Sequence, residues 1–227
     1  MGYKFTLSSI NALLEDLSKE YLLFAPKRFE GQAPYSDLDS IRYGEVQSIE
    51  EMELDQKSHY SMKEVFYPIS ETLFYFTENT VTESEPRVQK EALVFLRSCD
   101  LHSVKRLDAI YLENKFADHY YKRLRDKIKF VLIGCPEAYE NCFCVDMETN
   151  RSDDYSASID RDGDVFYMDV RDEDLDGFFE RHSEEKLHVE PSYVTETPTR
   201  VKLSDTIDPK KVAGSEFWNQ YDKRCIA

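Results

Sequence analysis

The sequence predicts a mixed α/β protein of a single domain, whose sheet has a parallel βαβ core and antiparallel hairpins. Its 227 residues are 41% hydrophobic and 13% aromatic, which is enough material for one substantial core. Two short, continuous apolar runs at 92–96 and 129–134 flank a stretch with helical periodicity, which is the order of a parallel crossover. The turn Asp160-Arg-Asp-Gly163 lies between two alternating stretches and indicates a hairpin.

The first third of the chain begins with an amphipathic helix over 9–22, for which Ser8 or Ser9 is the expected cap. Residues 25–60 contain two prolines and many polar groups, so we expect loops with short extended pieces. The aromatic and β-branched runs 64–68 and 72–77 predict strands, and the polar stretch 80–89 predicts a surface loop.

The middle of the chain has the clearest pattern. After the buried strand at 92–96 we expect helices at 101–113 and 116–127, then a second buried strand at 129–134. Such a crossover is right-handed in nearly all proteins. The hairpin at 156–159 and 165–170 follows, then a short acidic helix within 172–186 and an extended or looped segment over 187–212. The spacing of the acidic residues in the turn that begins at Asp160 also suggests a calcium-binding loop. An EF-hand loop has its glycine at position six, however, and Gly163 is at position four, so a turn is the favoured interpretation.

Composition and charge exclude several function classes. The chain has 45 acidic and 29 basic residues and a net charge of −16, which argues against nucleic acid or an anionic membrane as a partner. No apolar run approaches the roughly 20 residues of a membrane span, and no signal-peptide pattern is present, so we expect a cytoplasmic protein. The seven glycines are too far apart for a GxGxxG turn or a phosphate-binding loop.

The most informative residues are the five cysteines. An odd number without a secretory signal argues against a disulfide framework. Cys99 and Cys135 each follow one of the two buried strands, so both should emerge at the carboxyl edge of the sheet. Cys142 and Cys144 lie in the next loop, which is long enough to fold back over that edge. The sequence therefore predicts that four thiols converge.

Four convergent thiols suit a zinc ion or an iron–sulfur cluster. The chain has no CxxC pair, and its C-x6-C-x-C spacing favours a larger object such as a [4Fe–4S] cube. Arg97, Lys105 and Arg106 flank the cysteines, and the helix near Leu101, with Asp100 as its cap, would aim its positive end at an anionic cluster. Buried core thiols and a thiol oxidoreductase using Cys142 and Cys144 are the other interpretations.

Three segments of the sequence resemble the A subunit of anaerobic sulfite reductase and its relatives among the beta subunits of sulfhydrogenases. They are Pro68-Ile-Ser-Glu-Thr-Leu-Phe-Tyr-Phe76, the segment 95–111 around Cys99, and Cys135-Pro-Glu-Ala-Tyr-Glu-Asn-Cys-Phe-Cys-Val-Asp-Met-Glu-Thr-Asn150. The resemblance implies an electron-transfer subunit that is itself non-catalytic. It would relay electrons from a flavin-containing subunit to a siroheme-containing subunit that reduces sulfite.

The resemblance also implies the ligands of the cluster. Cys99, Cys135, Cys142 and Cys144 match the family's four amino-terminal cysteines and would bind one [4Fe–4S] cluster, with Asp100 or His102 as an alternative ligand or a tuning group. Residues 1–215 would form the amino-terminal α/β iron–sulfur domain. Residues 216–227, which include Cys225, would be the truncated start of a ferredoxin-like segment. The alternative function is a structural zinc or cysteine-core domain that acts as an assembly platform.

Overall fold

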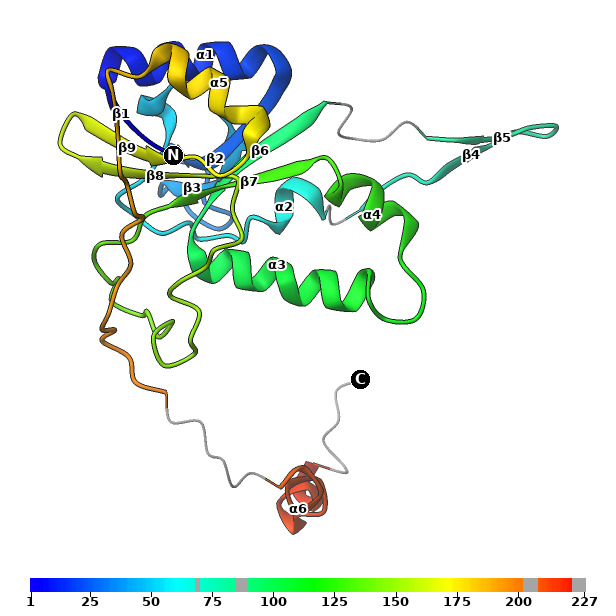
Figure 1. Cartoon of the computed structure of the whole chain (residues 1–227). Coiled ribbons are helices and arrows are strands. Elements are labelled where there is room, and N and C mark those ends of the chain that lie inside the picture. Colours follow the sequence, from blue (N-terminus) through cyan, green and yellow to red (C-terminus); the bar gives the residue numbers. More distant parts are fainter. Residues whose placement is uncertain (68–69, 85–89, 202–207, 222–227) are drawn as a thin grey trace.

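The computed structural model describes residues 1–67, 70–84, 90–201 and 208–221. Most of these residues form a large twisted sheet with helices packed on both of its faces (Figure 1). The predicted mixed α/β class is confirmed. Cys225 and part of the segment 64–68 lie outside the described residues.

Four neighbouring parallel strands form the centre of the sheet: β2 (Tyr21–Phe29), β6 (Glu91–Leu96), β7 (Ile128–Ile133) and β8 (Ala157–Asp162). The helices α3 (Ser98–Tyr111) and α4 (His119–Arg125) connect β6 with β7, so the predicted crossover is confirmed. Every residue of β6 from Ala92 to Leu96 is buried, because helices cover both faces of the strand.

Antiparallel strands complete the sheet on both sides. β9 (Val165–Asp169), β1 (Gly2–Thr6) and β10 (Glu185–Leu187) follow β8, and β3 (Ser40–Glu45) pairs with β2 at the other edge. The strand order is β10-β1-β9-β8-β7-β6-β2-β3. The predicted hairpin of β8 and β9 is confirmed, and Gly163 in its turn has a φ of +60° that favours glycine.

Helices α1 (Leu7–Glu20) and α5 (Glu173–His182) cover one face of the sheet, and α3 and α4 cover the other (Figure 1). Successive residues of β6 alternate between the two cores: Leu93 and Phe95 join the first, whereas Ala92, Val94 and Leu96 join the second. Both helices on the first face were predicted. The cap of α1 is Thr6, which exchanges hydrogen bonds with Ser9, rather than the predicted Ser8 or Ser9. The helix begins and ends two residues earlier than expected.

The structure corrects two predictions in the first third of the chain. Residues 25–60 contain more regular structure than expected, because most of β2 and all of β3 fall there. The segment from Glu64, predicted as a strand, is instead the short helix α2 (Lys63–Phe66). Val65 and Phe66 are buried in the second core, and this tertiary packing overrides the β-propensity of the aromatic residues.

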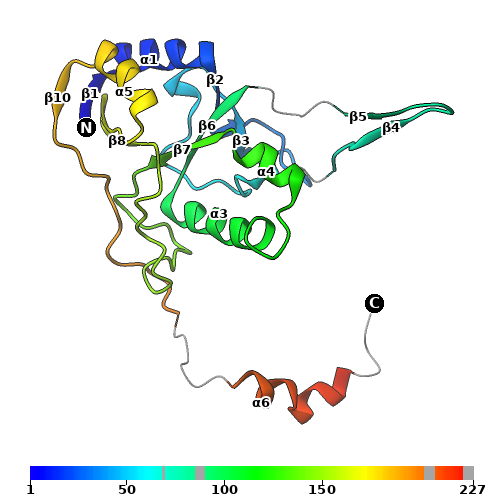
Figure 2. The same cartoon turned by 45° about the vertical axis from the view of Figure 1, so that its right-hand side comes forward.

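The predicted strand at 72–77 is confirmed as β4 (Phe74–Phe76), which pairs with β5 (Val81–Glu83) inside the expected surface loop. This two-stranded hairpin projects from the body of the molecule in both views (Figures 1 and 2). An ion pair of 2.8 Å between Glu83 and Arg123 joins the hairpin to α4.

Three short helices complete the described elements: η1 (Ile49–Glu51), α6 (Pro209–Ala213) and η2 (Glu216–Tyr221). α6 overlaps the end of the segment 187–212, which was expected to be extended or looped, and continues one residue beyond it. In the part of the chain that the structure describes, every helix is too short or too polar to cross a membrane.

Candidate functional site

The structure places four cysteines at the carboxyl end of the parallel strands. Cys99 is the second residue of α3, directly after β6, and Cys135 lies two positions beyond β7. Cys142 and Cys144 belong to the loop of residues 134–156, called here the cysteine loop, which connects β7 with β8. All four are free thiols, and Cys142 is buried while the other three are partly buried.

The thiols lie close enough to affect one another electrostatically. Burial raises the pKa of Cys99 to about 12, and Asp100, Cys144 and Cys135 add to the effect. Burial, with a contribution from Cys142, likewise raises the pKa values of Cys135 and Cys144. Cys99, Cys135 and Cys144 are therefore partly buried thiols whose pKa values lie above the ordinary range, and their joint ligation of one group stays a prediction.

These raised pKa values bear on two of the earlier interpretations. A thiol oxidoreductase needs a thiol of lowered pKa, whereas burial raises the pKa of Cys144. For a metal ion, no three His, Cys, Asp or Glu side chains among the described residues are grouped tightly enough to hold one. The thiols are thus neighbours without forming a closed single-ion site.

The start of α3 differs from the sequence prediction. The helix begins at Ser98 rather than near Leu101, so Cys99 lies inside the first turn and Asp100 is not the cap. Arg97 occupies the cap position, and its side chain makes no capping hydrogen bond, although its carbonyl oxygen accepts the amides of Asp100 and Leu101. The Ser98 hydroxyl is also buried and has no hydrogen-bond partner among the described residues. This unpartnered hydroxyl belongs to the residue that precedes Cys99 in the chain.

Arg97 connects three parts of the site. Its guanidinium donates hydrogen bonds to the carbonyl oxygens of Gly134 at 3.2 Å, Leu54 at 2.7 Å and Gln56 at 3.4 Å. It also lies 4.9 Å from the ring centroid of Tyr139 in the cysteine loop. The side chain is buried, and its positive charge partly offsets the effect of burial on the pKa of Cys135.

Of the other two basic residues expected beside the cysteines, neither lowers a cysteine pKa among the main causes, whereas Lys57, which was not expected there, does. Lys105 and Arg106 are exposed on α3, and Lys105 pairs with Asp154 at 3.7 Å. Lys57, in the loop that accepts the Arg97 hydrogen bonds, lowers the pKa values of Cys99, Cys135 and Cys144 against burial. No spacing signal in the sequence connects Lys57 with the cysteines.

The two candidate alternative ligands have different surroundings. The His102 Nε2 atom lies 2.8 Å from the carbonyl oxygen of Arg151, so this histidine fastens the end of the cysteine loop to α3. Asp100 is half-buried, and its own pKa is raised by burial, although Lys57 and Arg97 oppose the effect. Its negative charge raises the pKa of Cys99.

Residues 192–201 hold the cysteine loop from its other side. The Cys135 amide donates to the Ser192 carbonyl at 2.9 Å, and the Thr199 amide donates to the Cys142 carbonyl at 3.2 Å. The Ser192 amide donates in turn to both carboxylate oxygens of Asp160, each at 3.2 Å. Two cysteines are thereby positioned by a segment that follows them by more than fifty residues, a role that the sequence analysis missed.

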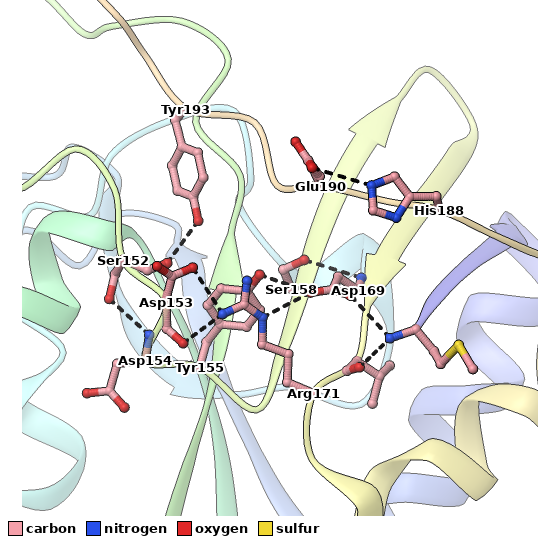
Figure 3. Close-up of polar contacts among 12 residues, drawn as sticks. Ser152, Asp153, Asp154, Tyr155, Ser158, Asp169, Arg171, His188, Glu190 and Tyr193 are labelled. Carbon is pink, nitrogen blue, oxygen red and sulfur yellow. Dashed lines mark hydrogen bonds and ion pairs between the residues drawn. The ribbon is translucent and has the colours of Figure 1, made fainter.

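The end of the cysteine loop is attached to β9 and the residues after it (Figure 3). Arg171 donates to the Asp153 carbonyl at 2.9 Å and to the Asp169 carboxylate at 3.2 Å. The Tyr155 hydroxyl also donates to Asp169, at 3.0 Å, and the Tyr193 hydroxyl donates to the Ser152 carbonyl at 2.9 Å (Figure 3). This network fixes the return of the loop into β8.

A cleft of about 430 Å³ opens beside Cys135. Its walls include Arg97, Tyr139 and Gly134, and Asp160 and Arg161 from β8. Its charged groups are largely paired within the protein, since Asp160 binds the Ser192 amide and Arg161 pairs with Asp55 at 3.2 Å. Gly134 and Pro136, the residues on either side of Cys135, line the cleft, so solvent approaches this part of the cysteine loop.

Fold and site together define an α/β protein with four free cysteines in the segments that follow the carboxyl ends of its parallel strands. The chain is 29% identical over 215 residues to sulfhydrogenase 2 subunit beta of Pyrococcus furiosus, and is a distant homologue of that protein. The match covers 85% of this chain and 61% of the relative, so the chain spans about three fifths of the relative's length. No protein-family model matches the chain. No solved structure matches it either.

Proposed function

We propose that this chain is an electron-transfer subunit of a multi-subunit oxidoreductase and that Cys99, Cys135, Cys142 and Cys144 hold a [4Fe–4S] cluster. The observation that carries the proposal is that four free thiols follow the ends of two neighbouring parallel strands, Cys99 after one strand and the other three after the next. The similarity to a sulfhydrogenase beta subunit supports a subunit role, because that relative is by name part of a larger assembly.

The donor set fits such a cluster. All four candidate ligands are sulfur atoms, which is the usual ligation of iron–sulfur centres. A tetrahedral zinc ion would draw its sulfur ligands to about 4 Å from one another, since each Zn–S bond is about 2.3 Å. Structural zinc sites usually supply their sulfur ligands as CxxC pairs, and this chain has no such pair, which favours a wider object.

The surroundings also suit an anionic group. Arg97 and Lys57 bring positive charge to the thiols, and the first turn of α3 brings amide groups without a side-chain cap. Because the thiols of Cys99, Cys135 and Cys144 have raised pKa values, ligation requires that they release protons. Cluster loading should therefore become more favourable as the pH rises.

A bound [4Fe–4S] cluster would store and pass on single electrons. The chain's own residues would hold it, set its surroundings and leave one side near solvent at the cleft beside Cys135. By the resemblance to the A subunit of anaerobic sulfite reductase, we propose that the electrons come from a flavin-containing subunit and go to a siroheme-containing subunit. Residues 1–215 would then form the iron–sulfur domain, and 216–227 would begin a ferredoxin-like segment.

Anaerobic reconstitution with iron and sulfide tests the proposal. The loaded chain should contain about four iron and four sulfide ions and show a visible absorption that bleaches on reduction. Serine variants of Cys99, Cys135, Cys142 and Cys144 should each lose most of the iron. Cys225→Ser is the matched control and should load normally, because one further cysteine cannot hold a cluster alone.

The same measurements test the alternative, a structural zinc or cysteine-core domain. Stoichiometric zinc with no reducible chromophore would replace the iron–sulfur proposal by that alternative. Iron uptake that survives all four single serine substitutions would show that the cluster is bound elsewhere. If the wild-type chain loads iron and sulfide and the serine variants do not, electron transfer from a reduced flavoprotein to the loaded chain would support the relay role.

A further inference from the structure

Arg97 is a buried cation without a carboxylate in close contact. Only 5% of the residue is exposed, and among the described residues its guanidinium forms hydrogen bonds with backbone carbonyl groups and no close ion pair with a carboxylate. Its hydrogen bonds go to three neutral carbonyl oxygens, those of Gly134, Leu54 and Gln56. A buried charge is costly unless an opposite charge compensates it, and an arginine does not lose its proton in proteins. The carboxylate of Asp100 offsets part of this charge, since Arg97 lowers the pKa of Asp100 against the effect of burial, and a further anion beside the guanidinium would offset the rest.

The neighbouring groups show where this anion belongs. The Arg97 carbonyl accepts the amides of Asp100 at 3.0 Å and Leu101 at 3.1 Å, so the residue forms the base of the helix that carries Cys99. Its guanidinium bonds the carbonyl of Gly134, the residue before Cys135, and faces the ring of Tyr139 in the cysteine loop. Thus Arg97 lies between the two strand ends from which the candidate ligands emerge.

We infer that Arg97 is a positioning residue that supplies the buried counter-charge for an anionic iron–sulfur cluster and thereby raises its reduction potential. This inference rests on the proposed function. One electron arriving from an external donor adds one negative charge, and no bond is made or broken. Because Arg97 stays protonated throughout, its fixed charge favours the reduced form. Its three carbonyl contacts also hold the loop at 54–57 against β7.

Lys57 provides a second cation with a different exposure. It follows Gln56, whose carbonyl oxygen Arg97 contacts, and its residue is exposed. An exposed charge is screened by salt, whereas a buried charge is screened much less. Arg97 should therefore act on the potential at any salt concentration, and Lys57 should act mainly at low salt.

The test is a mediated redox titration of the reconstituted chain, followed by visible absorption and electron paramagnetic resonance. At the midpoint potential of the wild type, Arg97→Gln should lower the ratio of reduced to oxidised cluster about tenfold, which is 59 mV for a one-electron couple. Arg97→Lys should change the ratio less than threefold, because it keeps the charge, but should lower thermal stability. Raising the salt from 0.05 to 0.5 M should leave the effect of Arg97→Gln unchanged and should diminish that of Lys57→Gln.

Lys105→Gln is the matched control, since it removes the same charge from an exposed position about 9 Å further along the axis of α3 than Cys99. It should change the ratio less than twofold. A loaded Arg97→Gln variant with the wild-type ratio would overturn this inference and leave the proposed function intact. If Arg97→Gln holds no cluster, the test uses Arg97→Lys instead. A ratio of reduced to oxidised cluster like that of the wild type supports the inference, and a tenfold fall in this ratio overturns it. A wild-type chain that takes up no iron and sulfide would overturn the proposed function, and this inference with it.

Discussion

Replacing Gly134 with alanine should disrupt the junction between β7 and the cysteine loop. A Cβ atom at this position would lie 1.9 Å from Asp160 Oδ1, 2.4 Å from its Cγ and 2.8 Å from its Oδ2. All three carboxylate atoms are too close, so no small rotation of the side chain relieves the contact. The carboxylate must move away from the Ser192 amide to which it is bonded.

The cost of this substitution has two parts. A half-buried amide left without its acceptor costs about 1–3 kcal/mol, and crowding in a packed site costs about 1–3 kcal/mol. We therefore expect Gly134→Ala to lower the free energy of unfolding by about 2–6 kcal/mol. Gly177→Ala is the matched control, because that glycine lies in α5 with open space around it and should gain about 0.5–1 kcal/mol.

Urea unfolding of the metal-free chain, followed by circular dichroism, measures both substitutions. The Asp160→Ala background removes the clashing carboxylate, and there Gly134→Ala should cost at least about 1 kcal/mol less than in the wild type. If Gly134→Ala destabilises both backgrounds equally, the contact with Asp160 is not the cause and the reasoning is refuted. An unchanged stability of the single variant would refute it as well.

Three further predictions follow from burial, charge and hydrogen bonding. Phe95→Ala should lower the free energy of unfolding by about 3–5 kcal/mol, because Phe95 is buried in the first core. Phe76→Ala should change it by no more than about 0.5 kcal/mol, because this residue is 73% exposed. Equal effects of the two substitutions in urea unfolding would contradict the assignment of the core. The pKa of Asp16 is lowered to about 2 by hydrogen bonds from His182 and Lys19, so the stability it contributes is complete above pH 4 and disappears towards pH 2. Unfolding curves of wild type and Asp16→Asn should converge over that range, and a constant difference would exclude this role. His102→Ala should cost about 1 kcal/mol but retain the iron, since His102 bonds a backbone carbonyl; lost iron would instead identify a ligand.

The position of the cysteines could be predicted because it depends on simple geometry. Cys99 and Cys135 each follow an apolar run, and neighbouring parallel strands end at the same edge of a sheet. The role of Lys57 could not be predicted in this way. It reaches the thiols because the carbonyl groups of Leu54 and Gln56 bind Arg97, a contact between residues far apart in the chain.

The errors in the fold have a similar origin. The run at 64–66 has a high strand propensity, yet it forms α2 because Val65 and Phe66 fill a space in the second core. The end of β2 contains Pro26 and was expected to be a loop. It continues as a strand because β3 pairs with it there, next to the edge of the sheet. In both places a distant partner decided the local structure.

By itself, the sequence determined the α/β class, the parallel crossover, the helices on the first face and the edge at which the thiols emerge. These follow from hydrophobic periodicity, turn chemistry and the handedness of the chain, all of which are local properties. Only the tertiary structure decided which groups surround the cysteines. These are the buried Arg97, the carboxylate of Asp160 packed close to Gly134, and residues 192–201, which form hydrogen bonds with the cysteine loop. Those contacts join segments that are remote in sequence, so they exist only once the sheet has brought the ends of its strands together.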